Sequence, residues 1–164
     1  MYFYAKVKYM ASIYQYKVEG ISGDEIDFAN FEGKKIIVVN VASECGFTSQ
    51  YQQLQELYSE FSDKLVVIGC PSNDFGAQEP GSNPEIRTFC ERNYGVKFPL
   101  TTKIAIQTEP IYQWLCQKSL NGVMDSEVKW NFQKYLLNET GQLVDVCPSS
   151  LSPLDPKIID WLNS

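Results

Sequence analysis

The chain has 164 residues and a net charge of −6, and it contains no histidine. This length fits one domain with a sizeable core, and an acidic chain without a basic patch is not expected to bind nucleic acid. The absence of histidine excludes Ser-His-Asp and Cys-His hydrolases together with most zinc and haem sites. We therefore expect no cofactor or metal, and a nucleophile that is activated without an imidazole.

The amino terminus carries lysines where a signal peptide would need its apolar stretch, and no apolar run reaches the roughly 18–20 residues of a membrane span. Five cysteines, an odd number without a Cys-x-x-Cys pair, argue against a disulfide scaffold and favour a reducing compartment. We expect a cytoplasmic protein with an N-terminal extension over 1–12 and a single domain over 13–164. The extension either lengthens an edge strand or precedes a true start at Met10.

The first half of the chain predicts a βαβ unit. A β-branched run is typical of a central strand buried on both faces, and an amphipathic helix separates it from a second such run. Two strands joined through a helix are expected to be parallel. The expected elements are a half-buried strand over 13–18, a turn over 20–23, a central strand over 35–42, a loop over 43–49 with Thr48 or Ser49 as the helix N-cap, a helix over 50–62 and a strand over 65–70.

The second half predicts an irregular loop, three helices and a hairpin. In chain order these are a loop over 71–81, a helix from Asn83, its predicted N-cap, to about 93 that stops at Gly95, a short strand over 103–106, a helix over 109–118, strands over 129–137 and 142–146 joined by a turn over 138–141, and a helix over 154–162. This order, βαβ first and ββα last, predicts an α/β thioredoxin-like fold with a mixed central sheet flanked by helices on both faces.

Cys45 is the candidate nucleophile, because it follows a buried parallel strand and precedes a helix. Ligands of open α/β sheets bind beyond the carboxyl ends of the strands, and the N–H groups at a helix N-terminus favour a thiolate. The alternative is that Cys45 merely fills a turn. Gly46 beside it lets another group approach closely, which favours the functional interpretation.

Three segments in order resemble the motifs of the glutathione peroxidase family. The first surrounds Cys45, which stands where that family carries its reactive cysteine or selenocysteine. Looser agreement at Lys97-Phe-Pro99, Lys103-Ile104 and 148–153 extends the resemblance to about residues 13–163. The three motif segments are Gly33-Lys-Lys-Ile-Ile-Val-Val-Asn-Val-Ala-Ser-Glu-Cys-Gly-Phe-Thr48, Asn73-Asp-Phe-Gly-Ala-Gln-Glu-Pro-Gly81 and Lys129-Trp-Asn-Phe-Gln-Lys-Tyr135.

The resemblance implies a thiol peroxidase that reduces hydrogen peroxide and organic or lipid hydroperoxides, with a role in the response to oxidative stress. It also implies that Gln78, Trp130 and Asn131 surround Cys45. Amide and indole N–H groups are donors that can stabilise a thiolate or the oxygen leaving the peroxide. Trp130 and Asn131 are neighbours on a predicted strand, so both can reach Cys45 only if the backbone bends there.

The second motif departs from the family pattern at two positions. The usual cysteine is Ser72, with Cys70 two positions earlier, and Asp74 replaces the usual glutamine. A negative charge facing Cys45 would oppose thiolate formation, so we expect Asp74 to face solvent.

A sulfenic acid on Cys45 must be resolved by another thiol. Two-cysteine members of the family use a cysteine in the helix after the second motif, where Cys90 lies, and are then reduced by thioredoxin. Cys90 is therefore the candidate resolving residue. Its spacing with Ile86 and Phe89 also fits a core position, which would leave a one-cysteine cycle with an external thiol. We expect Cys70, Cys116 and Cys147 to be buried.

The stretch over 103–129 is short, as in compact, mostly monomeric family members that prefer thioredoxin to glutathione. The expected partners are thus a hydroperoxide and thioredoxin or glutathione as the reductant. Two alternatives remain. A thioredoxin-type oxidoreductase would need a second sulfur at Thr48, and a peroxide sensor would pass the oxidation of Cys45 to a partner protein.

Overall fold

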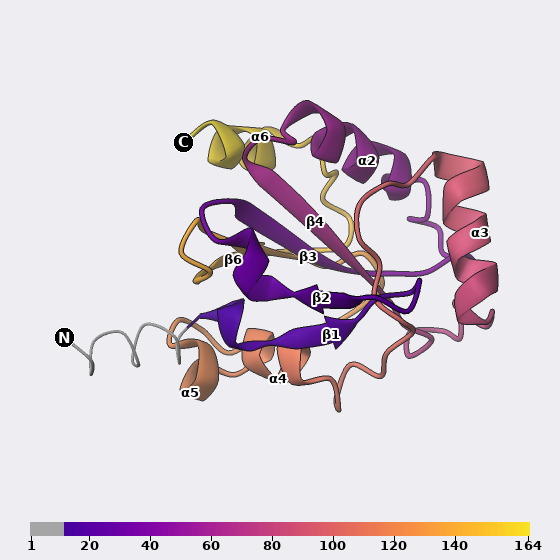
Figure 1. Cartoon of the computed structure of the whole chain (residues 1–164), viewed down its shortest axis with the longest axis horizontal. Helices are drawn as coiled ribbons and strands as arrows, with labels where there is room; N and C mark the ends of the chain where they lie inside the picture. Colours follow the sequence, from indigo (N-terminus) through magenta and orange to yellow (C-terminus); the bar gives the residue numbers. More distant parts are fainter. Residues whose placement is uncertain (1–11) are drawn as a thin grey trace.

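The computed structural model describes residues 12–164, so the predicted N-terminal extension lies outside the described residues except for Ser12. A four-stranded sheet in the order β4–β3–β5–β6 forms the centre (Figure 1). Strand β3 pairs parallel with β4 and antiparallel with β5, and β5 pairs antiparallel with β6. The predicted mixed sheet, including the parallel pair, is confirmed.

Short helices and a separate two-stranded sheet of β1 and β2 complete the fold. The elements are η1 (Ile13–Gln15), β1 (Lys17–Glu19), β2 (Glu25–Asp27), η2 (Phe28–Phe31), β3 (Lys35–Val41), α2 (Gln50–Glu60), β4 (Leu65–Pro71), α3 (Asn83–Tyr94), α4 (Pro110–Cys116), α5 (Lys118–Asn121), β5 (Lys134–Leu137), β6 (Leu143–Cys147) and α6 (Pro156–Asn163). No helix within residues 12–164 has the length and apolar character needed to cross a membrane.

Strands β3 and β4 are buried along their whole length because both faces of the sheet are covered. Alternate side chains of β3 enter two different core clusters. Ile36 and Val38 pack with residues of α4, whereas Ile37 and Val39 pack with residues of α2, α3 and α6. Figure 1 shows the same layering, with α2 and α6 on one side of the sheet and α4 on the other. The predicted helices on both faces are confirmed.

Helix α2 packs on the sheet through one apolar stripe. Tyr51, Leu54 and Leu57 are buried at helical spacing, and Gln52 and Glu56 between them are exposed. The residue before the helix is Ser49, whose side chain makes no capping bond. Thr48, the other predicted cap, has a different role that is described with the site.

The N-cap of helix α3 is Ser82, one residue before the predicted N-cap Asn83. Ser82 forms a capping box with Glu85. The helix ends where expected, because Gly95 adopts the left-handed conformation at its C-terminus (φ 59°).

Three predicted strands differ from the structure. In the strand expected over 13–18, Ser12 caps a 3-10 turn through a hydrogen bond from the Tyr14 N–H (3.0 Å), so only β1 remains. The strand expected over 103–106 is reduced to one bridge between Ile104 and Ser72. The strand expected over 129–137 begins only at Lys134.

The predicted helix over 109–118 is shorter than expected and is followed by the separate turn of α5. The Asn121 side chain donates to the carbonyls of Trp114 (2.8 Å) and Leu115 (3.2 Å). It thereby satisfies groups at the end of α4 that a longer helix would have paired internally.

Leu54 tests whether the α2 face of the sheet is as closely packed as the structure shows. Leu54→Ala is expected to lower the free energy of unfolding by about 2–5 kcal/mol, because a fully buried leucine leaves a cavity behind. Gln52→Ala, at an exposed position of the same helix, is the control and should change stability by less than ~0.5 kcal/mol in urea unfolding. Equal effects of the two substitutions would contradict the packing of α2.

Candidate active site

The loop after β3 holds Cys45 in a turn that is closed by Thr48. The Cys45 N–H donates to Thr48 Oγ1 (2.9 Å), and the same hydroxyl donates to the Ala42 carbonyl (2.9 Å). Thr48 is buried, whereas Cys45 is half-buried. The threonine side chain therefore fixes the shape of the loop and leaves the sulfur partly accessible.

One backbone N–H group contacts the sulfur from the side of α2. The Phe47 N–H donates to Cys45 Sγ (3.3 Å), and the Thr48 N–H donates to the Cys45 carbonyl (3.1 Å) in the first of several turns that lead into α2. The loop thus places one backbone N–H donor against the sulfur, at the point where the chain turns into α2.

The second motif lies beside the Cys45 loop because β3 and β4 are parallel and end at the same edge of the sheet. The Glu44 N–H donates to the Gln78 carbonyl (3.0 Å). The Ser43 N–H donates to Glu79 Oε1 (3.1 Å). Two hydrogen bonds thus join the loop of Cys45 to the loop of Gln78.

Asn131 joins the third motif to the second. Its Nδ2 donates to Gln78 Oε1 (3.0 Å) and to the Phe75 carbonyl (3.3 Å), and the residue is fully buried. Its Oδ1 is buried without a hydrogen-bond partner among residues 12–164. Hydrogen bonds therefore join the loop that carries Cys45 to Gln78 through Glu44, and join Gln78 to Asn131.

Trp130 is held against the same loop by packing. Its ring meets the Phe75 ring edge-on at a centroid distance of 6.1 Å. A Cβ at Gly76 would come within 2.8 Å of Trp130 Cη2, and Gly76 has a positive φ of 68°. Glycine has no Cβ and adopts a positive φ without strain, so Gly76 allows the indole to lie over the loop.

The backbone is strained beside two of the predicted site residues. Within residues 12–164, the non-glycine residues with positive φ are Ala77 (53°) and Phe132 (65°). They are the immediate neighbours of Gln78 and Asn131. Such conformations cost on the order of 1–3 kcal/mol and concentrate at functional sites. The bend that the sequence requires for Trp130 and Asn131 to share a site is thus present.

Asn40 maintains this bend and was not identified from the sequence. Its Nδ2 donates to the Trp130 carbonyl (3.0 Å), and its own carbonyl accepts from the Phe132 N–H (2.6 Å). The available signal was an amide inside a β-branched run that is buried on both faces. Burying such a group is costly unless it is hydrogen-bonded, so its presence in the run indicates a specific partner.

Glu79 is a second residue that the sequence analysis did not single out. It is fully buried, and its backbone N–H donates to Asn73 Oδ1 (2.9 Å). Burial raises the pKa of its carboxyl group, while the hydrogen bond from the Ser43 N–H acts in the opposite direction. A glutamate placed between Gln78 and Pro80 gives no periodic signal, which is why its burial could not be predicted.

The two departures from the family pattern have structural roles. Ser72 is buried and its Oγ accepts from the Asp74 N–H (3.3 Å). Asp74 is exposed, as expected, but it is not merely solvated, because its carboxylate accepts from the Ile106 N–H (2.7 Å). The substituted residues connect the second motif to the segment over 103–106.

The other cysteines lie mainly in the core. Cys90 is fully buried, and burial raises the pKa of its thiol to about 11, with the nearby Tyr51 hydroxyl acting in the opposite direction. Burial likewise raises the pKa of Cys70 to about 12 and raises the pKa of Cys147. Cys116 is the exception to the expected burial, since it is half-buried at the wall of a cavity.

Cys90 and Cys45 share one core cluster although they belong to different elements. Cys90 is among its buried members, together with Tyr51 and Ile86, and Cys45 packs against it from the edge. All five cysteines carry free thiols. Within residues 12–164, no group of three or more histidine, cysteine, aspartate or glutamate residues could hold a metal ion.

The family model described as glutathione peroxidase matches residues 13–116. The chain is 42% identical over 149 residues to the glutathione peroxidase-like peroxiredoxin gpx1 of Schizosaccharomyces pombe, covering 88% of this chain and 93% of that protein. The chain belongs to the glutathione peroxidase family. The resemblance to this family is confirmed, and the chain is a peroxide-reducing oxidoreductase of this family.

Further comparisons agree with this family and with the fold. The hydroperoxy fatty acid reductase gpx1 of a Synechocystis strain is 42% identical over 144 residues, covering 81% of this chain and 84% of that protein. The solved structure of Trgpx in apo form has a TM-score of 0.69 at 31% identity and covers 93% of this chain and 96% of that chain. A thioredoxin family protein from Chlorobium tepidum has a TM-score of 0.63 at 16% identity over 91% of this chain and 93% of that chain, which confirms the thioredoxin-like fold.

Glu79→Gln is expected to change stability in a pH-dependent way. A carboxyl group whose pKa is raised in the folded state stabilises the folded protein at pH values below its ordinary pKa of 4.5. This contribution is lost as the pH rises through the raised pKa. Glutamine keeps an acceptor for the Ser43 N–H and removes the buried charge. The free energy of unfolding of the variant, relative to wild type, should therefore be higher at pH 7 than at pH 4.

Glu85→Gln is the matched control with the opposite sign. Hydrogen bonds from Ser82 lower the pKa of Glu85, so its contribution is present at pH 7 and is lost as the pH falls. The stability of this variant relative to wild type should be lower at pH 7 than at pH 4. The same pH trend in both variants would contradict the assignment of Glu79 as a buried, disfavoured carboxylate.

Proposed function

We propose that Cys45 is the peroxidatic cysteine of this thiol peroxidase. The Cys45 thiolate attacks the terminal oxygen of a hydroperoxide, an S–O bond forms and the O–O bond breaks. The departing alkoxide or hydroxide takes up a proton and leaves as an alcohol or water. Cys45 is left as a sulfenic acid, oxidised by two electrons.

Gln78 and Trp130 would supply donors for this step, and Asn131, whose two N–H bonds go to Gln78 Oε1 and the Phe75 carbonyl, would position Gln78. The hydrogen bond from Asn131 to Gln78 Oε1 orients the Gln78 amide, so that its N–H₂ group remains available as a donor. Donors held by a rigid frame stabilise the developing oxyanion without reorganising during the reaction. The observation that carries this proposal is the joining of all three motifs by hydrogen bonds next to Cys45, with strained backbone at Ala77 and Phe132.

Cys90 is proposed as the resolving cysteine. Its thiolate attacks the Cys45 sulfur, an S–S bond forms, the S–O bond breaks, and hydroxide leaves as water after protonation. The shared core cluster supports this pairing. A fully buried thiol whose pKa is raised to about 11 is a poor nucleophile, so the C-terminal part of α3 must unwind before the step.

Thioredoxin is the proposed reductant. Its dithiol reduces the Cys45–Cys90 disulfide to two thiols and is itself oxidised to a disulfide, which balances the cycle. We also propose that the domain spans 13–164, acts as a monomer and works in the cytoplasm. Five free thiols fit a reducing compartment, and the short stretch over 103–129 supports the thioredoxin-dependent, monomeric type.

The nucleophile is tested by Cys45→Ser in a coupled assay that follows NADPH oxidation with thioredoxin and thioredoxin reductase. We expect at least a 1,000-fold loss of hydrogen peroxide turnover, because a serine hydroxyl cannot cycle through a sulfenic acid. Cys147→Ser, at a buried strand end, is the control and should retain activity. Substantial turnover by Cys45→Ser would refute the assignment.

The resolving role is tested by Cys90→Ser in the same assay, with glutathione and its reductase in a parallel reaction. Turnover with thioredoxin should collapse, while a single stoichiometric reduction of peroxide by Cys45 should survive. Undiminished thioredoxin-dependent turnover would show that Cys90 has only a structural role, and it would favour a one-cysteine cycle.

A further inference from the structure

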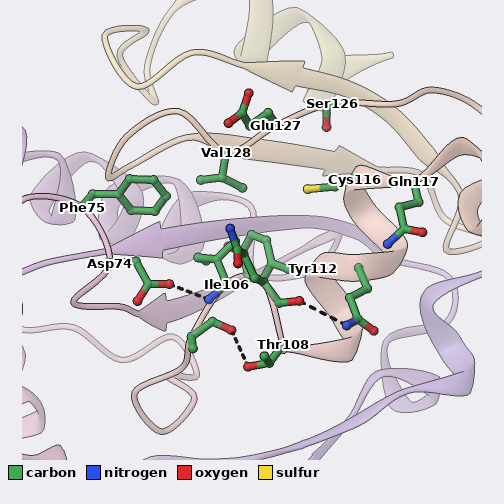
Figure 2. A pocket seen from close by; sticks show the side chains of 13 residues that line it. Asp74, Phe75, Ile106, Thr108, Tyr112, Cys116, Gln117, Ser126, Glu127 and Val128 are labelled. Carbon is green, nitrogen blue, oxygen red and sulfur yellow. Dashed lines mark hydrogen bonds between the residues drawn. The ribbon is translucent and has the colours of Figure 1, made fainter.

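The second motif borders two hollows on different faces of the sheet. The larger, a cavity of about 640 Å³, has Phe75, Ile106 and Cys116 in its wall (Figure 2). These three residues pack in the cluster on the α4 face, whereas Cys45 and Cys90 pack in the cluster on the α2 face. The smaller, a pocket of about 420 Å³, is lined by residues of the α2-face cluster and therefore lies on the side of the two cysteines.

Neighbours of both proposed redox cysteines line the smaller pocket. Glu44, which directly precedes Cys45, is one of them. Phe89, which directly precedes Cys90, is another. The pocket thus lies between the loop of Cys45 and helix α3. A protein that reaches a disulfide between these two cysteines covers this pocket as well.

Three carboxylates line this pocket, which we call the acidic pocket. Glu44 and Glu85 are exposed, and Glu79 is fully buried. None of the described residues that line it is basic. Lys103 lies close by, but the backbone holds it, since its Nζ donates to the carbonyls of Glu79 (3.3 Å) and Gly81 (2.8 Å). Negative charge is therefore in excess at this place.

Two buried polar atoms of the acidic pocket have no partner. Glu79 Oε1 accepts from the Ser43 N–H, but neither Glu79 Oε2 nor Ser43 Oγ has a hydrogen-bond partner within residues 12–164. Both residues line the pocket. A buried carboxylate oxygen without a partner is costly, and a cation placed near it offsets that cost. The unpaired atoms therefore point to a ligand that brings positive charge and N–H donors.

We propose that the acidic pocket is the docking site of the reductant protein, which places a lysine or arginine side chain from beside its reactive thiol into it. The inference rests on the proposed function, because it takes a Cys45–Cys90 disulfide as the group to be reduced, and it adds how the partner is recognised. Opposite charges across an interface speed the encounter and fix the register of the two proteins. Dithiothreitol, a small dithiol without a basic group, does not use the pocket.

Glu44→Lys tests the docking site by reversing one charge of its wall, while the backbone N–H that bonds to the Gln78 carbonyl is kept. At saturating hydrogen peroxide, kcat/KM for thioredoxin should fall about 10-fold, through a raised KM. Glu44→Gln removes the charge without reversing it and should lower the same value about 3-fold. Glu60→Lys makes an equal charge change at the exposed far end of α2 and is the control, with an expected change of less than about 2-fold.

Two further measurements on Glu44→Lys separate docking from chemistry. One is the rate at which the reduced protein consumes one equivalent of hydrogen peroxide, and the other is the rate at which dithiothreitol reduces the oxidised protein. Both should stay within about 2-fold of wild type, because neither small molecule docks through a basic side chain. Added salt should lower kcat/KM for thioredoxin more in wild type than in the variant, because it screens the attraction.

An equal loss with thioredoxin and with dithiothreitol would overturn the docking inference, since Glu44 would then act on the chemistry of the cysteines. A kcat/KM for thioredoxin that Glu44→Lys leaves unchanged would overturn it as well. Wild-type protein that peroxide oxidises and dithiothreitol reduces, but thioredoxin does not, would instead refute the proposed reductant, on which the inference rests.

Discussion

The arrangement of the site depends on one buried amide, that of Asn40. Its side chain holds the Trp130 carbonyl and its backbone carbonyl holds the Phe132 N–H, so the third motif is tied to the last residues of β3. This pairing keeps Phe132 at a positive φ and delays the start of β5 until Lys134. A regular strand would send the side chains of Trp130 and Asn131 to opposite faces. The bend lets Asn131 bond to Gln78 while Trp130 packs over Gly76.

The sequence predicted the parts of the fold that depend on local pattern. β-branched runs identified β3 and β4, and a helix between them made the pair parallel. Proline and glycine placed the two ends of α3. The predicted strand over 129–137 was wrong at its first half because Phe132 is held by a residue some 90 positions away, which no local pattern records. The burial of Glu79 depends on a loop contact with Ser43 and was missed for the same reason.

The proposed catalytic cycle places opposite demands on the two cysteines. Cys45 is half-buried, and its sulfur accepts a hydrogen bond from a backbone N–H. This partial exposure suits a nucleophile that reacts with peroxide without a prior opening of the structure. Cys90 is closed in the core, and burial raises the pKa of its thiol to about 11. A buried resolving thiol stays unreactive until α3 opens, so its accessibility rather than its intrinsic reactivity would set the rate of disulfide formation. Cys116 is the other half-buried thiol, and the remaining three cysteines are buried.

The most direct test of the central claim is to identify which of the five thiols one equivalent of hydrogen peroxide oxidises first. Cys90→Ser protein would be treated with peroxide in the presence of dimedone, which traps sulfenic acids, and digested for peptide mass spectrometry. Wild-type protein would be treated with peroxide alone and mapped for disulfides. We expect the dimedone adduct on Cys45 in the variant and a Cys45–Cys90 disulfide in wild type. A first adduct on Cys116, with Cys45 still reduced, would refute the assignment of Cys45 as the peroxidatic cysteine.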